Sequence, residues 1–255
     1  MKKAIVVVSF GTTHLDALEK NILRIENEIR NQFSEYDVFR AFTSRFIVKR
    51  LNERGENIKL ESEMIDQLVE EGYEEILVQP LHTIPGYEYE KIKKVTAHKQ
   101  GVKLSEPLLY GPEDYTVVIE ALNVAYKIDD LPEDEAMLFM AHGTDHFANG
   151  CYVTLGVKLN MFNERCQVAN VEGFPELEDL LSMIDLSGIK RIHLAPFMTV
   201  FGDHGKNDMA GQDNDSWKSI LGAEGFGIVI HGIGLGEIEG IRNIYIGKLR
   251  KLMNQ

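Results

Sequence analysis

Two stretches with one shared pattern decide the fold: KAIVVVSFGTTH at residues 3–14 and AMLFMAHGTDH at residues 136–146. Each is a short apolar run that ends in a glycine-containing loop, and aligning the two pairs Phe10 with His142. A short apolar run bounded by a turn is typical of a strand buried on both faces. The two stretches therefore predict the same strand and loop in each half of the chain.

A second pair of matching stretches extends this repeat. YEEILVQPLHTIPGYE at residues 73–88 aligns with IKRIHLAPFMTVFGDH at residues 189–204, and the alignment pairs Glu88 with His204. We interpret the chain as a duplicated α/β domain with a cleft between the two copies. In parallel α/β sheets, ligands bind beyond the carboxyl ends of the strands, where the loops carry the chemistry.

Strand and helix patterns alternate from end to end. The segments at residues 15–33 and 114–128 have apolar positions three and four residues apart, which is typical of helices. This β-α-β-α order predicts two similar domains, each a parallel sheet flanked by helices on both faces. The eight predicted strands are KAIVVVS, DVFRAF, EILVQP, VKLSEP, AMLFMA, VANVE, RIHLAP and GIVIH.

The polar stretch DDLPEDE, at residues 129–135, separates four predicted strands from the other four. We place the domain boundary there, which gives an N-terminal α/β domain at residues 1–129 and a C-terminal α/β domain at residues 130–255. The last pattern, IEGIRNIYIGKLRKLM, is helical and is a candidate to pack back across the first domain.

Composition narrows the class of protein. A chain of 255 residues with a net charge of -13 favours two domains and argues against general nucleic-acid binding, which depends on Lys and Arg. Two cysteines fit a reducing compartment and exclude a four-thiolate iron–sulfur cluster supplied by one chain. No run approaches the roughly 20 apolar residues of a membrane-spanning helix. We predict a cytoplasmic protein without a membrane partner, and we leave a homo-oligomer open.

Three polar side chains follow three consecutive predicted strands of the second half. His142 comes directly after AMLFMA, Glu172 ends VANVE, and His204 follows LAPFMTVFGD. An unpaired carboxylate is expensive to bury, so we expect Glu172 to pair with a cation. Two imidazoles and one carboxylate suit a divalent transition metal such as cobalt, nickel, iron or zinc. Because no thiolate lies near, we predict an open, exchangeable site rather than a closed structural zinc site.

Other candidates carry weaker signals. His146 lies four residues after His142, but HGTDH lacks the glutamate that a metalloprotease helix places beside its first histidine, so we favour a structural role for His146. The SFGTT loop resembles an anion cradle at a helix start, and we predict that Ser9 and Phe10 bind the substrate. A basic cluster has two open interpretations, a solvated helix face or an anion-binding rim. Its members are Arg40, Arg45, Lys49, Arg50 and Arg54.

The stretch FGDHGKNDMAGQDNDSWKSIL, at residues 201–221, has too few apolar side chains to form a core by itself. We expect its aspartates to cap helices or to orient His204, and Trp217 to pack in the core. Among the other histidines, His82 and His231 are strand-end candidates for lining the cleft, and His193 is expected to be packed inside its strand.

With these features in place, the chain closely resembles the anaerobic-type cobaltochelatases of cobalamin biosynthesis, class II chelatases that insert cobalt into sirohydrochlorin. The stretches that carry the resemblance are KKAIVVVSFGTTH, FRAFTS, LHTIPGYEYEKI, HGTDH, VEGFPE and GDHGKNDMAGQDNDSWK. Together they span nearly the whole chain, and the last is the most specific.

The resemblance implies a lyase that takes Co²⁺ and a tetrapyrrole as substrates and that uses no organic cofactor. It implies metal binding by His142, Glu172 and His204, and a role for Glu88 on the substrate side, directing protons or gripping the ring. Metallation requires removal of two pyrrolic protons, and a neutral histidine accepts protons near neutral pH. We predict that His142 is this base.

Several alternatives stay open. The same ligands would serve a nickel or iron chelatase, and precorrin-2 would serve as an alternative substrate to sirohydrochlorin. A non-catalytic tetrapyrrole- or haem-binding protein would need the cleft but no proton acceptor. A histidine-dependent phosphoryl transferase would place an arginine directly before His142, where Ala141 stands.

Overall fold

The computed structural model describes residues 2–254, which divide into two compact units. The first unit comprises the chain up to Tyr110 together with the stretch from Ile241 onward, and the second unit is Gly111–Gly240. The strands are β1 (Lys3–Ser9), β2 (Asp37–Phe42), β3 (Glu75–Pro80), β4 (Val102–Leu104), β5 (Glu135–Gly143), β6 (Cys166–Glu172), β7 (Arg191–Pro196) and β8 (Gly227–Ile230).

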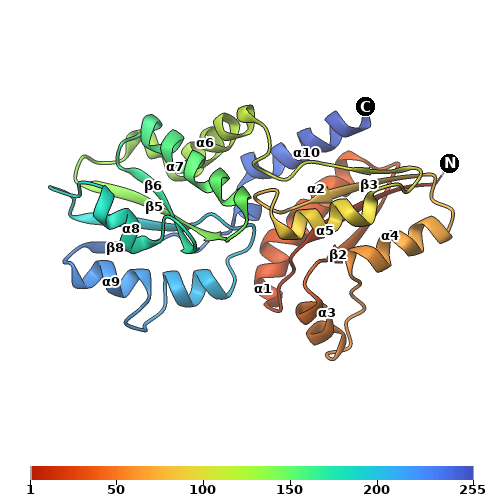
Figure 1. Ribbon diagram of the computed structural model, residues 1–255, viewed down its shortest axis with the longest axis horizontal. Coiled ribbons are helices and arrows are strands. Elements are labelled where there is room, and N and C mark those ends of the chain that lie inside the picture. Colours follow the sequence, from red (N-terminus) through yellow and green to blue (C-terminus); the bar gives the residue numbers. More distant parts are fainter. Residues whose placement is uncertain (1, 255) are drawn as a thin grey trace. The chain divides into compact units, whose positions relative to one another are not determined.

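Helices follow nearly every strand, as the alternating pattern predicts (Figure 1). The α-helices are α1 (Leu15–Ala17), α2 (Arg24–Gln32), α3 (Arg45–Asn52), α4 (Glu61–Glu70), α5 (Tyr87–Thr96), α6 (Pro112–Tyr126), α7 (Gly150–Phe162), α8 (Leu177–Met183), α9 (Trp217–Ala223) and α10 (Glu239–Met253). The 3-10 and π-helical turns are η1 (Leu18–Leu23), η2 (Ile128–Asp130), η3 (Phe147–Asn149), η4 (Gly205–Met209) and η5 (Leu235–Glu237).

The two sheets have the same topology, which confirms the predicted fold. The first has the order β2-β1-β3-β4 and the second the order β6-β5-β7-β8, and every strand pair is parallel. In the central strands, Val8 pairs with Pro80 in the first sheet, and Met140 pairs with Pro196 in the second. Because parallel strands end at one edge, the loops after β5, β6 and β7 gather at the carboxyl edge of the second sheet.

Each unit has its own apolar core. In the first, α4 and α5 cover a sheet face that includes Val6 and Val78. In the second, α8 and α9 cover a face that includes Leu138 and Leu194, and Trp217 of α9 is 5% exposed within this core. Figure 1 shows α6 and α7 on the opposite side of the second sheet from α8 and α9. Trp217 therefore packs in the core, as expected.

The division between the units lies before α6, whereas the sequence placed it after residue 129. The polar stretch after α6 resembles a linker in composition, but hydrogen bonds tie it to the second unit. The Asn163 amide donates to the Ile128 carbonyl (2.7 Å), and Arg165 donates to the Leu131 carbonyl (3.0 Å). Composition alone does not reveal these hydrogen bonds, so it could not give the position of the boundary.

The last helix, α10, groups with the first unit. The Tyr245 hydroxyl donates to the Leu81 carbonyl (3.1 Å), and the Arg242 guanidinium pairs with Glu28 (2.6 Å). These contacts connect α10 to the segment after β3 and to α2, so the chain returns to its first sheet after completing the second unit.

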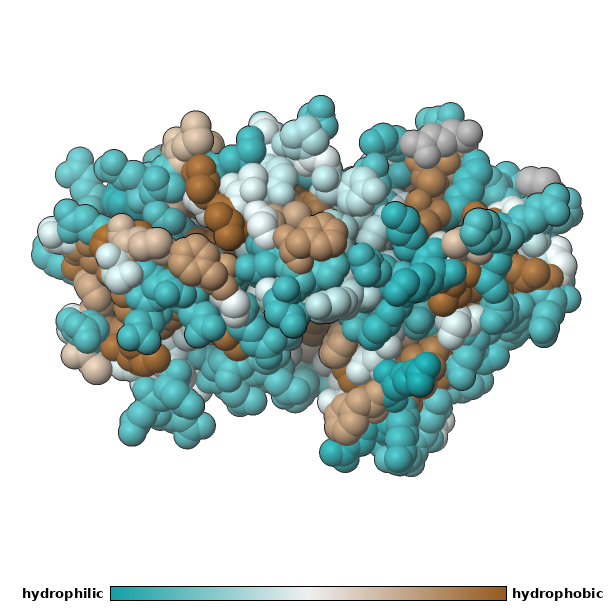
Figure 2. Space-filling model, viewed as in Figure 1, coloured by the Kyte–Doolittle hydropathy of each residue, from teal (hydrophilic) through white to brown (hydrophobic). Residues whose placement is uncertain are grey.

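The helix α7 is apolar on two sides. Leu155 and Leu159 are buried against the sheet, whereas Val153, Val157 and Met161, spaced four residues apart, form an exposed stripe. Figure 2 shows apolar side chains among hydrophilic ones in the region of this helix. Within residues 2–254, no helix is both long and apolar enough to cross a lipid bilayer.

Candidate functional site

Two of the predicted ligands leave neighbouring strands at the carboxyl edge of the second sheet. His142 is the penultimate residue of β5, and Glu172 is the last residue of β6. The parallel register pairs Gly143 with Glu172, so His142 and Glu172 emerge at nearly the same height. Both side chains belong to exposed residues. The ends of β5 and β6 therefore carry one histidine and one glutamate at the same edge of the sheet.

The third predicted ligand approaches from the loop after β7. His204 stands directly before η4, and its ring lies 4.7 Å from the His142 ring, centroid to centroid, in an edge-to-face arrangement. The structure thus brings together two histidines that are separated along the chain by α7, β6, α8 and β7. This juxtaposition is the central feature of the site.

Hydrogen bonds determine which nitrogen each imidazole presents. His142 Nδ1 lies 2.9 Å from the Gly143 carbonyl oxygen, and His204 Nδ1 lies 2.6 Å from a carboxylate oxygen of Asp208. Both oxygens only accept, so each Nδ1 carries the hydrogen in a neutral ring and each Nε2 keeps its lone pair. Both rings therefore offer Nε2 to a metal ion or a proton. Asp208 plays the orienting part expected of the aspartates around His204.

Glu172 stands at the predicted strand end, but its carboxylate does not form a three-residue metal site with the two imidazoles. Among residues 2–254, no group of three or more His, Cys, Asp or Glu side chains is arranged to hold a metal ion. The structure therefore shows a pair of imidazoles with an exposed carboxylate at the adjacent strand end, and the three-residue ligand set stays a prediction. Glu172 belongs to the site through the β5–β6 register.

Hydrogen bonds from two asparagines hold the loop that follows β6. The buried amide of Asn170 donates to the carbonyls of Gly173 (3.3 Å) and Phe174 (3.0 Å), and the Asn149 amide donates to Phe174 (2.6 Å). His146 is buried, and its Nδ1 accepts from the Ala148 N–H (3.1 Å), which supports the structural role predicted for it. Neither asparagine was predicted from the sequence, although a polar residue inside the apolar run VANVE is a usable signal.

The three predicted substrate-side residues all lie in the first unit. Ser9 ends β1 and is buried, whereas Phe10 is 52% exposed directly after it. Glu88 lies in the first turn of α5, and one of its carboxylate oxygens accepts from Lys91 (2.5 Å). In the SFGTT loop, the Thr12 hydroxyl accepts from the His14 N–H (3.1 Å), so this hydroxyl serves its own turn.

Several members of the basic cluster have partners within the first unit. Arg40 makes two hydrogen bonds, of 2.6 and 2.8 Å, to the fully buried carboxylate of Glu26. Arg50 lies over the ring of Phe46 at 5.2 Å, and Arg54 donates to the Thr13 carbonyl (3.2 Å). Arg40 therefore acts within the fold of the first unit, and both readings of the other four residues stay predictions.

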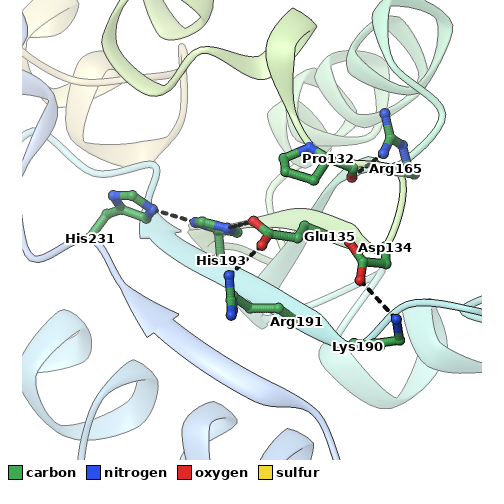
Figure 3. A network of polar contacts seen from close by, with 8 residues as sticks. All are labelled: Pro132, Asp134, Glu135, Arg165, Lys190, Arg191, His193 and His231. Atoms are coloured by element: carbon green, nitrogen blue, oxygen red, sulfur yellow. Dashed lines mark hydrogen bonds and ion pairs between the residues drawn. The ribbon is translucent and has the colours of Figure 1, made fainter.

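A second polar network lies at the opposite, amino edge of the second sheet and extends along its strands (Figure 3). Glu135 accepts from His193 Nε2 (2.6 Å) and from Arg191, and His193 Nδ1 lies 2.9 Å from His231 Nε2. The hydrogen bond from His193 and the neighbouring Arg191 lower the pKa of Glu135, and burial lowers the pKa of His231. The network joins the beginnings of β5 and β7 to the end of β8, away from the strand ends that carry His142.

His82, which follows β3, is a histidine whose pKa is strongly lowered in the folded protein. Both ring nitrogens of His82 are buried without a hydrogen-bond partner, although the residue as a whole is only partly buried. Burial lowers the pKa of His82 to about 4, so the ring is neutral in the folded protein at neutral pH. The unfolded chain binds this proton near pH 6.5, and the folded chain binds it only near pH 4.

We therefore expect His82 to destabilise the protein as the pH falls from about 6.5 to about 4, by roughly 3 kcal/mol. Its contribution to stability is complete above pH 6.5 and is lost across that window. The measurement is urea unfolding of the natural chain and of His82→Gln at several pH values. The difference between the two curves isolates His82 from the other titrating groups, and parallel curves would refute the assignment.

Two parallel four-stranded sheets of identical order, with paired imidazoles at the carboxyl edge of one, define a chelatase-type protein. SirB from Bacillus subtilis, solved with Fe³⁺, matches with a TM-score of 0.66 at 14% identity, covering 99% of this chain and 96% of that one. CbiX, described as the terminal enzyme of sirohaem biosynthesis in denitrifying bacteria, matches with a TM-score of 0.59 at 12% identity, covering 98% and 99%. These likenesses establish the fold.

Sequence comparison gives the family. The family model for cobalt chelatase (CbiK) matches residues 3–254, and the chain belongs to this family. The sirohydrochlorin cobaltochelatase of Salmonella typhimurium is 36% identical over 259 residues, covering 100% of this chain and 97% of that protein. The sirohydrochlorin cobaltochelatase CbiKC of Nitratidesulfovibrio vulgaris is 30% identical, covering 97% and 89%.

Proposed function

We propose that this chain inserts Co²⁺ into sirohydrochlorin, with His142 as the proton acceptor and with His142, Glu172 and His204 as the residues that receive the metal. The observation that carries the site assignment is the paired imidazoles, each of which offers Nε2. Family membership and the two cobaltochelatase relatives support the choice of metal and tetrapyrrole.

The reaction exchanges one divalent ion for two protons. Each pyrrole N–H that reacts leaves its electron pair on nitrogen and gives its proton to a base, and the resulting dianion balances Co²⁺. A neutral imidazole is a suitable acceptor because its ordinary pKa is near working pH. His142 Nε2 can accept because the Gly143 carbonyl already engages Nδ1. The protonated ring is exposed and returns its proton to water.

The metal site must bind loosely, since a site that holds its ion tightly cannot pass it on. Imidazole nitrogens suit cobalt, and one carboxylate balances part of its charge. The hydrogen bond from His204 to Asp208 fixes the tautomer and orientation of the ring. Exposure of His142 and Glu172 leaves room for the incoming ion to exchange its water.

An absorption assay tests this function. Purified protein is mixed with metal-free sirohydrochlorin and Co²⁺, Ni²⁺ or Fe²⁺, and the spectral change is followed over the uncatalysed rate. We expect the fastest turnover with Co²⁺. Faster turnover with Ni²⁺ or Fe²⁺ would assign a different metal, and tetrapyrrole binding without acceleration by any metal would indicate a binding protein.

The metal-binding assignment predicts a selective loss of metal affinity. Asp208→Asn keeps the hydrogen bond to His204 but removes the charge, and it should raise the Co²⁺ concentration for half-maximal rate about 10–100-fold. His204→Ala and Glu172→Gln should raise it at least as much, with sirohydrochlorin binding unchanged. Asp215→Asn, an exposed change in the same stretch, is the matched control. Unaltered Co²⁺ dependence in all three site variants would reject these ligands.

A further inference from the structure

Two loops at the carboxyl edge of the second sheet interlock through their glycines. Gly143 ends β5 and Gly173 directly follows β6, and both have a φ of 77°. A Cβ on Gly143 would lie 1.7 Å from the Glu172 carbonyl oxygen, and a Cβ on Gly173 would lie 2.9 Å from the Thr144 carbonyl oxygen. Each loop therefore packs against a backbone carbonyl of the other, without room for a side chain between them.

The side chain of Asn149 bonds both loops. Its Oδ1 accepts from the Thr144 N–H (3.1 Å), and its amide donates to the Phe174 carbonyl (2.6 Å). Thr144 stands two residues after His142, and Phe174 stands two residues after Glu172. Because a backbone N–H only donates and a carbonyl only accepts, the two bonds fix which end of the amide faces each loop. One planar group thus spans the segments that follow two of the predicted metal ligands.

Helix capping does not account for Asn149. The residue stands at the N-cap of α7, but its φ of -55° and ψ of -28° are helical, and its side chain makes no capping hydrogen bond. An ordinary N-cap has an extended backbone and accepts from an N–H in the first turn of its own helix. Asn149 accepts instead from Thr144, which precedes it in the chain. Its side chain therefore serves the two loops and not the helix.

Stability does not account for the second asparagine. Asn170 lies in β6 and is 1% exposed, and its amide donates to the carbonyls of Gly173 (3.3 Å) and Phe174 (3.0 Å). Its Oδ1 is buried without a hydrogen-bond partner among residues 2–254, and such an atom ordinarily costs about 1–3 kcal/mol. An amide is thus an expensive way to fill this position. What it provides is a second pair of hydrogen bonds to the loop that follows Glu172.

We propose that Asn149 is a positioning residue for the metal substrate, which holds the backbone after His142 and the backbone after Glu172 at a fixed separation so that both side chains receive one ion. Asn170 keeps the second of these loops in place. The inference rests on the proposed function, because it presupposes that His142 and Glu172 bind Co²⁺. A residue that acts through the backbone of two ligands affects metal affinity and leaves proton transfer alone, and such outer partners ordinarily contribute about 10–100-fold.

The test replaces Asn149 with aspartate. Asn149→Asp keeps an acceptor for the Thr144 N–H but has no donor for the Phe174 carbonyl, so it breaks only the tie between the loops. A carboxylate at a helix start is favourable, so urea unfolding should not move to lower urea. We expect the Co²⁺ concentration for half-maximal rate to rise about 10-fold, with kcat and the sirohydrochlorin dependence nearly unchanged. The added charge alone would attract Co²⁺ and lower that concentration, so the direction of the shift separates the two effects.

Asn160→Asp is the matched control, since it makes the same charge change in α7 and removes an amide bond to the Glu164 carbonyl (2.8 Å), away from both loops. Asn149→Ala removes both bonds without adding charge and should raise the Co²⁺ requirement at least as much. Titration of Co²⁺ into protein without tetrapyrrole, followed by the visible absorption of the bound ion, should show the same shifts without turnover.

A Co²⁺ requirement in Asn149→Asp or Asn149→Ala that is no higher than in Asn160→Asp would overturn this inference, as would a loss confined to kcat. Either result would leave the proposed function standing. A natural chain that never metallates sirohydrochlorin would overturn both.

Discussion

Replacing His142 with alanine is expected to lower kcat about 10²–10⁴-fold, the range ordinarily lost with a general base. The residue is exposed and its ring bonds the carbonyl of the next residue, so removal of the ring should leave the fold intact. Affinity for metal-free sirohydrochlorin should be nearly unchanged. The measurements are the rate of cobalt insertion at saturating substrates and the absorption change on tetrapyrrole binding without metal.

A control and a rescue distinguish the base role from a ligand role. His98→Asn removes an exposed histidine from a turn of the first unit, where the positive φ of 65° suits asparagine, and should leave the rate unchanged. Added imidazole should restore part of the His142→Ala rate at saturating Co²⁺. Full recovery through higher Co²⁺ alone would assign His142 to metal binding only, and a normal rate in His142→Ala would eliminate it from the reaction.

The strands were predictable because their signal is local. An apolar run such as KAIVVVS needs no information from the rest of the chain, and its repeat around residue 140 fixes which strands are equivalent. The meeting of His142 and His204 followed from topology, since both stand at carboxyl ends of parallel strands in one sheet. The Nδ1 hydrogen bonds did not follow, because they depend on ring orientation and on the turn of η4.

The features that escaped prediction depend on contacts distant in sequence. Glu135, His193 and His231 come from three strands, and only the register of β5, β7 and β8 brings them together.

Gly143 holds the end of β5 close to β6, and Gly143→Ala is expected to lower the free energy of unfolding by about 3 kcal/mol or more. Its φ of 77° is left-handed, which costs an L-residue about 1–2 kcal/mol. A Cβ there would lie 1.7 Å from the Glu172 carbonyl oxygen and 2.6 Å from Asn170 Cβ. Backbone must move to relieve this overlap, and overpacking ordinarily costs a further 1–3 kcal/mol.

Gly188→Ala separates the two contributions, because Gly188 has a similar φ of 83° but open space around its Cβ position. We expect this control to lose only the conformational part, about 1–2 kcal/mol in urea unfolding. The additional loss in Gly143→Ala measures the contact between β5 and β6. Since that contact sets the heights of His142 and Glu172, the same variant should lose cobalt insertion at temperatures where it is still folded. Equal stability of the two variants, or full activity in folded Gly143→Ala, would show that the strand ends tolerate displacement and that the close β5–β6 approach does not position the site.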